Sequence, residues 1–213
     1  MPLDAAVRRR LQKLLSEPAD SATLARFDDD ARRLWNRTLK LLGLGLINTD
    51  PDLDALEIAC IALQLPLAMR TETGTKLGSI RLLDRAEQAA ELLVGYAGSQ
   101  VDPSLLDRGI RLLHEAAQRN PMTDDARILA DAVNLDDFGL SGLLTSALRM
   151  GLSGGLATII QAFEKREAYG YWNARLKDGF HFDATRTMAL RRLDAARNFV
   201  RSLREELDED RPT

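Results

Sequence analysis

Apolar residues recur every three or four positions along most of the chain, which is the spacing of one face of an α-helix. The sequence contains no convincing runs that alternate apolar and polar residues, as half-buried strands do. We therefore expect an all-α protein without a sheet, a helical bundle of about eight to ten helices. The expected helices cover residues 3–15, 28–42, 53–65, 79–96, 103–119, 123–139, 140–150, 156–165 and 183–207, with a further segment from about Ser21.

The helical pattern shows neither an internal repeat nor a convincing linker, so we expect a single domain over residues 1–213. With 213 residues, 45% of them hydrophobic, the chain can bury one good core. The expected divisions are N-terminal helices at 1–27, a core at 28–139, C-terminal helices at 140–207 and a disordered tail at 208–213.

The stretch 123–139 has an unusual feature for an amphipathic helix. Thr123 can cap its first turn, and Ile128, Ala132 and Leu135 fall on one apolar face. Asp131 falls on that same face, three residues after Ile128 and four before Leu135. A carboxylate among core residues is costly unless it is paired. Its partner could be a metal, a cation, a set of amide donors or a proton.

The run 131–136, Asp-Ala-Val-Asn-Leu-Asp, is followed by Gly139 and resembles the last motif of the HD-domain metal-dependent phosphohydrolases. In that family the motif reads D-A-D-x-L-D, with a glycine soon after. Its first aspartate is a metal ligand and corresponds to Asp131. Val133 stands where the family has its second aspartate.

Residues 30–36 resemble the first motif of the same family, in which a histidine ligand is followed by x-x-R-V. Arg33 and Leu34 fit that pattern, and Asp30 occupies the histidine position. An aspartate can bind a hard metal ion, although an aspartate at this point is more often a cap or a partner of the helix dipole.

Residues 53–65 are apolar nearly all round, so we expect this helix to be central and to end before Pro66. It resembles the family's helix that ends in the His-Asp pair, and here that pair is replaced by Leu63 and Gln64. Leucine cannot bind a metal, and glutamine offers only a neutral carbonyl oxygen.

The resemblance implies the HD-type fold with its activity lost, because of the four ligand positions only Asp131 is kept in kind. We expect a pseudoenzyme that acts as a binding or interaction module for an unidentified small molecule or protein, with no catalytic residues and no metal or other cofactor. The resemblance implies a vestigial pocket made of Asp30, Arg33, Leu63, Gln64, His114 and Asp131.

One alternative is a working metal-dependent phosphohydrolase for nucleotides or other phosphoesters. Its metal shell would combine Asp30, His114, Asp131 and also Gln64 around Mn, Fe, Ni, Zn or Mg. We favour a simpler interpretation of His114, as a histidine at the core edge bonded to a backbone carbonyl. Without a metal, we expect Asp131 to be contacted by Arg33, Asn36 or His114.

A second alternative is a helical assembly protein that acts through the aromatic segment and the last helix. The last helix carries a stripe that can pack on the core or on a twin helix in a homodimer, made of Leu190, Leu193, Val200, Leu203 and Leu207. We expect the aromatic segment to pin the last helix to the body, and a subunit interface is the next interpretation. The aromatic residues concerned are Tyr169, Tyr171, Trp172, Phe180 and Phe182.

Composition narrows these options. The formal net charge of −3 argues against a nucleic-acid binder, and the basic runs at 8–10 and 191–192 are interpreted as solvated helix faces. The single cysteine, Cys60, excludes an internal disulfide and is expected to be buried and inert. We expect no membrane span and no signal peptide, hence a cytoplasmic protein. No H-E-x-x-H, C-x-x-C or G-x-S-x-G pattern occurs.

Overall fold

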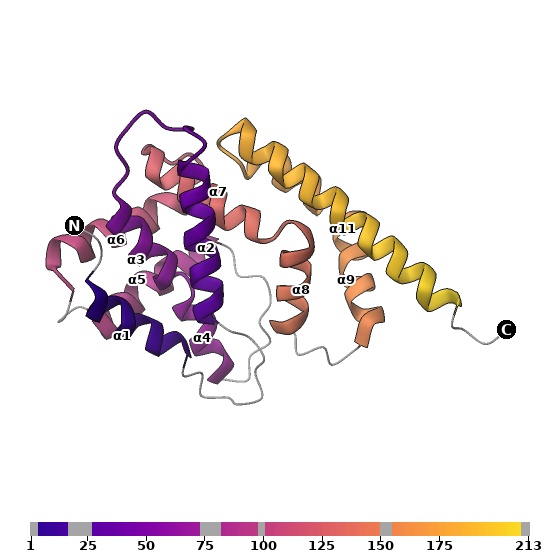
Figure 1. Cartoon of the computed structure of the whole chain (residues 1–213), viewed down its shortest axis with the longest axis horizontal. Coiled ribbons are helices and arrows are strands. Elements are labelled where there is room, and N and C mark those ends of the chain that lie inside the picture. The colour runs from indigo at the N-terminus through magenta and orange to yellow at the C-terminus, as the bar shows by residue number, and fades with distance from the viewer. Residues whose placement is uncertain (1–3, 17–26, 73–81, 98–100, 150–154, 210–213) are drawn as a thin grey trace. The chain divides into compact units, whose positions relative to one another are not determined.

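The structure of the chain is a computed structural model that describes residues 4–16, 27–72, 82–97, 101–149 and 155–209. These residues form helices α1 to α11 and include no strand, which confirms the all-α prediction (Figure 1). None of the described helices is both long enough and apolar enough to cross a bilayer. The chain groups into two compact units, residues 1–132 and 133–213, and the boundary falls inside α7. The single domain expected from the sequence stays a prediction.

The first unit is organised around α3. This helix packs against α2, α4, α5 and α6, and all of its residues from Ala55 to Ala62 are buried, as its apolar sequence predicts (Figure 1). The helices of this unit are α1 (Ala5–Ser16), α2 (Phe27–Leu42), α3 (Leu53–Ala62), α4 (Leu65–Glu72), α5 (Leu82–Ala97), α6 (Pro103–Ala116) and most of α7 (Asp124–Asp136).

Two of these helices begin at aspartate caps. The Asp52 side chain accepts a hydrogen bond from the Ala55 amide at 3.1 Å, and Asp102 accepts one from the Leu105 amide at 3.0 Å. Pro103 follows Asp102 at the first helical position, where a missing N–H costs nothing. The helix starts expected at these aspartates are confirmed.

Helix α3 ends before Pro66, as expected, but Pro66 is not the residue that stops it. A turn at Leu63 and Gln64 separates α3 from α4, and Pro66 is the second residue of α4. Proline is tolerated there because the amides of the first turn have no partner within the helix. No helix was expected between residues 65 and 79, where α4 extends through Glu72. Residues 73–81 lie outside the described residues, as does the start of the segment expected from Ser21.

The second unit is organised around α11 (Asp183–Glu209), which packs against α8 (Gly139–Arg149), α9 (Gly155–Ala168) and α10 (Tyr171–Asp178). Helix α10 was not expected from the sequence. Helix α11 includes the first two residues of the tail expected to be disordered, and residues 210–213 lie outside the described part. Leu190 is exposed rather than part of the buried stripe, which consists of Thr185, Ala189, Leu193, Ala196 and Val200.

Gly139 turns the chain between α7 and α8. Its φ is +85°, and a Cβ atom added there would lie 2.9 Å from the Cβ of Arg192. Arg192 in turn donates from Nη1 to the carbonyl oxygen of Leu135 at 3.0 Å. The close approach of α11 therefore requires glycine at this turn, both for its backbone conformation and for its size.

Cys60 lies on α3 and is completely buried. Its Sγ atom is 3.5 Å from Oγ1 of Thr38 on α2. Burial, which disfavours the thiolate, raises the pKa of Cys60 to about 12. The prediction of a buried thiol is confirmed, and its lack of reactivity stays a prediction.

Candidate functional site

Asp131 lies inside the first unit. The helix that carries it, α7, opens as predicted, with Oγ1 of Thr123 accepting a hydrogen bond from the Ala126 amide at 3.4 Å. Asp131 has 0% exposure, and so do Ile128 and Ala132 on the same face. Since a buried carboxylate is stable only when its charge is compensated, the groups packed near this turn of α7 decide what the site can do.

Arg37 on α2 is packed against that turn. It is 7% exposed, and its Nη1 atom donates to the carbonyl oxygen of Ala132 at 3.3 Å. Ala132 is the residue next to Asp131, so a buried guanidinium lies beside the segment that carries the buried carboxylate. Arg37 was not among the residues expected at this site, and the contact expected between Asp131 and Arg33 stays a prediction. Arg37 follows Asp30 by seven residues, which places both on one face of α2. This spacing is the feature of the sequence that could have indicated that Arg37 is buried.

Asp30 is also buried and is paired within its own helix. Its Oδ1 atom lies 2.8 Å from Nη2 of Arg33, and its exposure is 6%. The side chain of Arg33 is 31% exposed, so the pair reaches from the interior towards the surface. A metal ion at Asp30 would have to compete with this internal cation.

Leu63 and Gln64 form the turn between α3 and α4, and both are at most 1% exposed. The carbonyl oxygen of Leu63 accepts a hydrogen bond from Nε of Arg85 at 2.6 Å. Oε1 of Gln64 is buried without a hydrogen-bond partner among the described residues. The positions that resemble the His-Asp pair are therefore interior positions that carry no charge.

His114 is exposed on α6, which differs from the core-edge position expected from the sequence. The buried face of α6 contains Leu112 and Leu113, whereas Ile110, the apolar neighbour on which the expectation rested, is only partly buried. Asn36 on α2 is exposed as well. These two side chains are not placed in the interior with Asp131.

The residues present do not fit a divalent metal site of the HD type. Asp30 is paired with Arg33, Leu63 has no donor atom, and Gln64 offers a neutral carbonyl. Within the described ranges, no group of three or more His, Cys, Asp or Glu side chains is arranged to hold a metal ion.

Trp172 is the centre of an aromatic cluster in the second unit. It is 3% exposed, and its ring centroid lies 5.1 Å from that of Phe138, 5.8 Å from Phe163 and 4.9 Å from Tyr171. Phe180, also buried, lies 5.4 Å from Phe138. These edge-on and tilted arrangements are the favourable ones for aromatic rings, so the cluster packs α9 and α10 together.

Two other aromatic residues expected at an interface have different surroundings. Tyr169 is 79% exposed, and Phe182 is partly buried. Trp172 and Phe180 serve internal packing, so Tyr169 is the member of this group most accessible to a partner.

Tyr171 lies at the edge of the cluster beside a polar group. Its hydroxyl is 3.5 Å from Oδ2 of Asp137, and burial raises its pKa above the usual value. Nη2 of Arg175 donates to Oδ1 of Asn134 at 2.6 Å and to Oδ2 of Asp137 at 3.0 Å. These bonds join the end of α7 to α10, and the raised pKa keeps the Tyr171 hydroxyl protonated at neutral pH.

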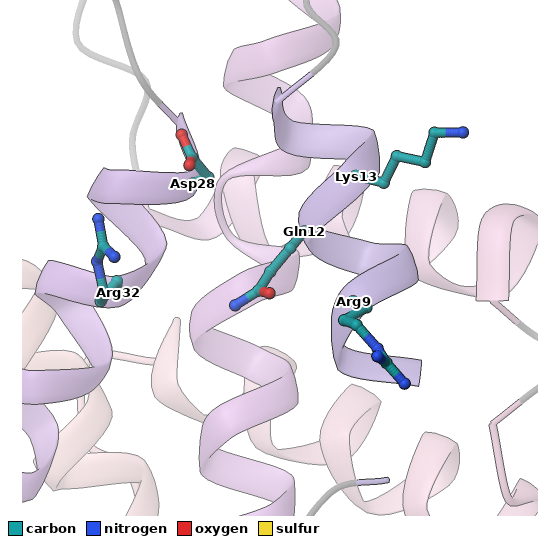
Figure 2. Close-up of a pocket in the computed structure, with 5 residues that line it drawn as sticks. All are labelled: Arg9, Gln12, Lys13, Asp28 and Arg32. Carbon is teal, nitrogen blue, oxygen red and sulfur yellow. The ribbon is translucent and has the colours of Figure 1, made fainter. Parts of the chain in front are cut away.

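A hollow of about 290 Å³ lies between α1 and the start of α2 (Figure 2). The described residues that line it all have polar side chains: Arg9, Gln12, Lys13, Asp28 and Arg32. The sequence analysis interpreted the basic run at 8–10 as a solvated helix face and did not anticipate the hollow, because the pairing of α1 with α2 is not visible in either helix alone.

No family model, curated protein or solved structure matches this chain. The likeness to HD-domain proteins therefore stays a resemblance carried by the quoted residues, and the structural evidence on those residues must be weighed by itself.

Proposed function

We propose that this chain is a catalytically degraded relative of the HD-domain phosphohydrolases that works as a non-enzymatic binding or interaction module. The observation that carries this proposal is the buried pair of Asp30 and Arg33, whose atoms lie 2.8 Å apart. Asp30, which stands where the HD family has its first metal ligand, has Arg33 as its counter-ion.

Charge balance supports the same proposal. Helix α2 brings two guanidinium groups, those of Arg33 and Arg37, to an interior that also holds the carboxylates of Asp30 and Asp131. An arginine stays protonated at any physiological pH and offers several donors in a fixed geometry. The interior that holds the two acidic side chains therefore contains positive charge that does not come from a metal ion.

The two residues at the turn after α3, Leu63 and Gln64, cannot replace the ligands that the His-Asp pair gives to a metal ion. Metal-assisted phosphoester hydrolysis needs ligands that hold the ion while it activates water. Leu63 supplies none, and Gln64 supplies one neutral oxygen in place of an anionic bridge. On this proposal the interior keeps a polar layer that stabilises the helices and leaves the surface for binding.

The test is a phosphohydrolase assay of the full chain on nucleotides and generic phosphoesters, with Mn²⁺, Fe²⁺, Ni²⁺, Zn²⁺ or Mg²⁺ added. We expect no turnover above that of the same metal in buffer. Metal-dependent turnover that is lost in Asp131→Asn and kept in Asp107→Asn would contradict the proposal. Asp107 is a suitable control because its side chain is 62% exposed on α6.

A second candidate function, assembly through the second unit, is favoured by its exposed apolar side chains. Tyr169 is 79% exposed, Leu156 49%, Leu144 47% and Leu190 43%. Sedimentation equilibrium over a wide concentration range tests this candidate. A dimer that dissociates in the Tyr169→Ser, Leu190→Ser double variant supports it, and a monomer at every concentration excludes it.

A further inference from the structure

The hollow between α1 and α2 has the character of an anion site. Three of its five lining side chains are cations (Arg9, Lys13 and Arg32), one is a carboxylate (Asp28), and one is an amide (Gln12). Figure 2 shows Gln12 reaching from α1 towards α2, from which Asp28 and Arg32 project. A concave surface with an excess of positive charge concentrates anions from solution.

Two of the cations belong to one face of α1. Arg9, Gln12 and Lys13 are three and four residues apart, which places them together on the helix surface. Arg9 is exposed and donates from Nε to the carbonyl oxygen of Ala5 at 3.2 Å. Figure 2 shows the side chains of Arg9 and Lys13 projecting from α1, and both residues are exposed. Long exposed side chains of this kind can turn towards a ligand without disturbing the packing beneath them.

The third cation, Arg32, is held in a pair that a ligand can replace. It bonds to Asp29, one turn earlier on α2, and the two side chains are 67% and 39% exposed. Exposed pairs of this kind contribute little to stability, so a phosphate group can take the place of the carboxylate. The planar guanidinium fork matches the oxygens of a phosphate better than it matches most other anions.

Asp28 limits what the rest of the ligand can be. A second anionic group beside its carboxylate would be repelled, whereas a hydroxyl or amino group could donate to it. Gln12 can accept or donate a hydrogen bond to the same part of the ligand. The volume of about 290 Å³ is at the lower end of the range for small-molecule pockets, enough for a sugar and one phosphate.

We propose that this hollow binds a small sugar monophosphate, with its phosphate on Arg9, Lys13 and Arg32 and its hydroxyl groups towards Asp28 and Gln12. The inference rests on α1 and the start of α2 alone. It does not depend on the HD resemblance, so the hydrolase assay and the binding experiment fail independently.

The first experiment is an isothermal titration of the full chain with ribose 5-phosphate, inorganic phosphate and ribose at one fixed ionic strength. We expect ribose 5-phosphate to bind more tightly than inorganic phosphate and ribose not to bind. Equal affinity for ribose 5-phosphate and inorganic phosphate would overturn the assignment of the ligand class. Absence of binding by both phosphates would overturn the site.

Variants then locate the binding. Arg9→Gln and Lys13→Gln should each raise the Kd for ribose 5-phosphate about tenfold, the usual effect of losing a charge-assisted bond. Arg10→Gln is the matched control, because Arg10 is the exposed neighbour on α1 that does not line the hollow. A loss in Arg10→Gln equal to that in Arg9→Gln would mean that binding follows overall charge and would overturn the site.

Asp28→Asn provides a gain that a folding defect could not mimic. Removal of this carboxylate removes a repulsion, so inorganic phosphate should bind more tightly to Asp28→Asn than to the unaltered chain. Ribose 5-phosphate should gain less, because it loses an acceptor for a hydroxyl group. Unchanged or weaker phosphate binding in Asp28→Asn would show that the anion does not lie in this hollow.

Discussion

The guanidinium group of Arg37 donates to the carbonyl oxygen of Ala132 at 3.3 Å and joins α2 to α7 across 95 residues of sequence. Arg37 is only 7% exposed, so its bond to that carbonyl is largely shielded from solvent. The bond is made to the residue next to Asp131, so it places a permanent cation beside the segment of α7 that carries this buried carboxylate.

The substitution Arg37→Met keeps most of the volume and removes the charge. We expect it to lower the free energy of unfolding by about 2–4 kcal/mol, because the buried carbonyl of Ala132 would lose its charged donor and the interior would lose a cation. Urea unfolding followed by circular dichroism measures the change. Arg111→Met is the control, since the Arg111 side chain is 70% exposed, and it should change the stability by less than about 0.5 kcal/mol. Similar small losses in both variants would show that Arg37 has no such role.

Cys60 should be unreactive in the folded protein. Burial raises its pKa to about 12, so the thiolate that reacts with disulfide reagents is scarce even at pH 9. Cys60 should react with a chromogenic disulfide reagent only when the protein unfolds. The labelling should therefore be slow in buffer and go to completion in urea. Rapid labelling in buffer would contradict the packing of α3.

The same thiol makes stability depend on pH. Its pKa is 9.0 when unperturbed and about 12 in the folded chain, so between these values the folded state holds a proton that the unfolded state has lost. Stability therefore falls as pH rises above 9, by about 1.4 kcal/mol per pH unit at most, and is unaffected by this group below pH 9. The difference in stability between the unaltered chain and Cys60→Ala should narrow over that window. A constant difference from pH 8 to 11 would contradict the assigned shift.

Trp172 and Tyr169 test whether the aromatic segment packs internally. Trp172→Ala removes the centre of the aromatic cluster and should lower the free energy of unfolding by about 3–5 kcal/mol. Tyr169→Ala, three residues earlier at an exposed position, should change it by less than about 0.5 kcal/mol. Thermal and urea unfolding at low protein concentration measure both. A larger loss from Tyr169→Ala than from Trp172→Ala would mean that the segment acts through another copy or another protein.

The helices could be predicted from the sequence because their apolar spacing is regular and their starts carry caps such as Asp52 and Asp102. Boundaries were harder where two rules compete. Pro66 was expected to end a helix, yet the structure places it in the first turn of the next one, the one part of a helix that accepts proline. Helix α10 was missed because it is short and lies within a segment rich in aromatic residues.

The candidate site could be predicted only in part. The burial of Asp131 follows from its place on the apolar face of α7, which the sequence displays. The position of Arg37 does not, because an arginine on an amphipathic helix usually faces water, and only the packing of α2 on its neighbours shows that this one does not. The exposure of His114 likewise depends on which side of α6 packs inward. The buried face is centred on Leu112 and Leu113, so His114, the next residue, lies at the surface and not at the edge of the core.

Metal analysis of the full chain, purified without chelator, tests the central proposal most directly. If arginine charges on α2 have replaced a metal, the protein should contain far less than one equivalent of Mn, Fe, Ni or Zn, and added metal should not raise its melting temperature. One equivalent of a transition metal that survives gel filtration and is lost in Asp131→Asn would contradict the account.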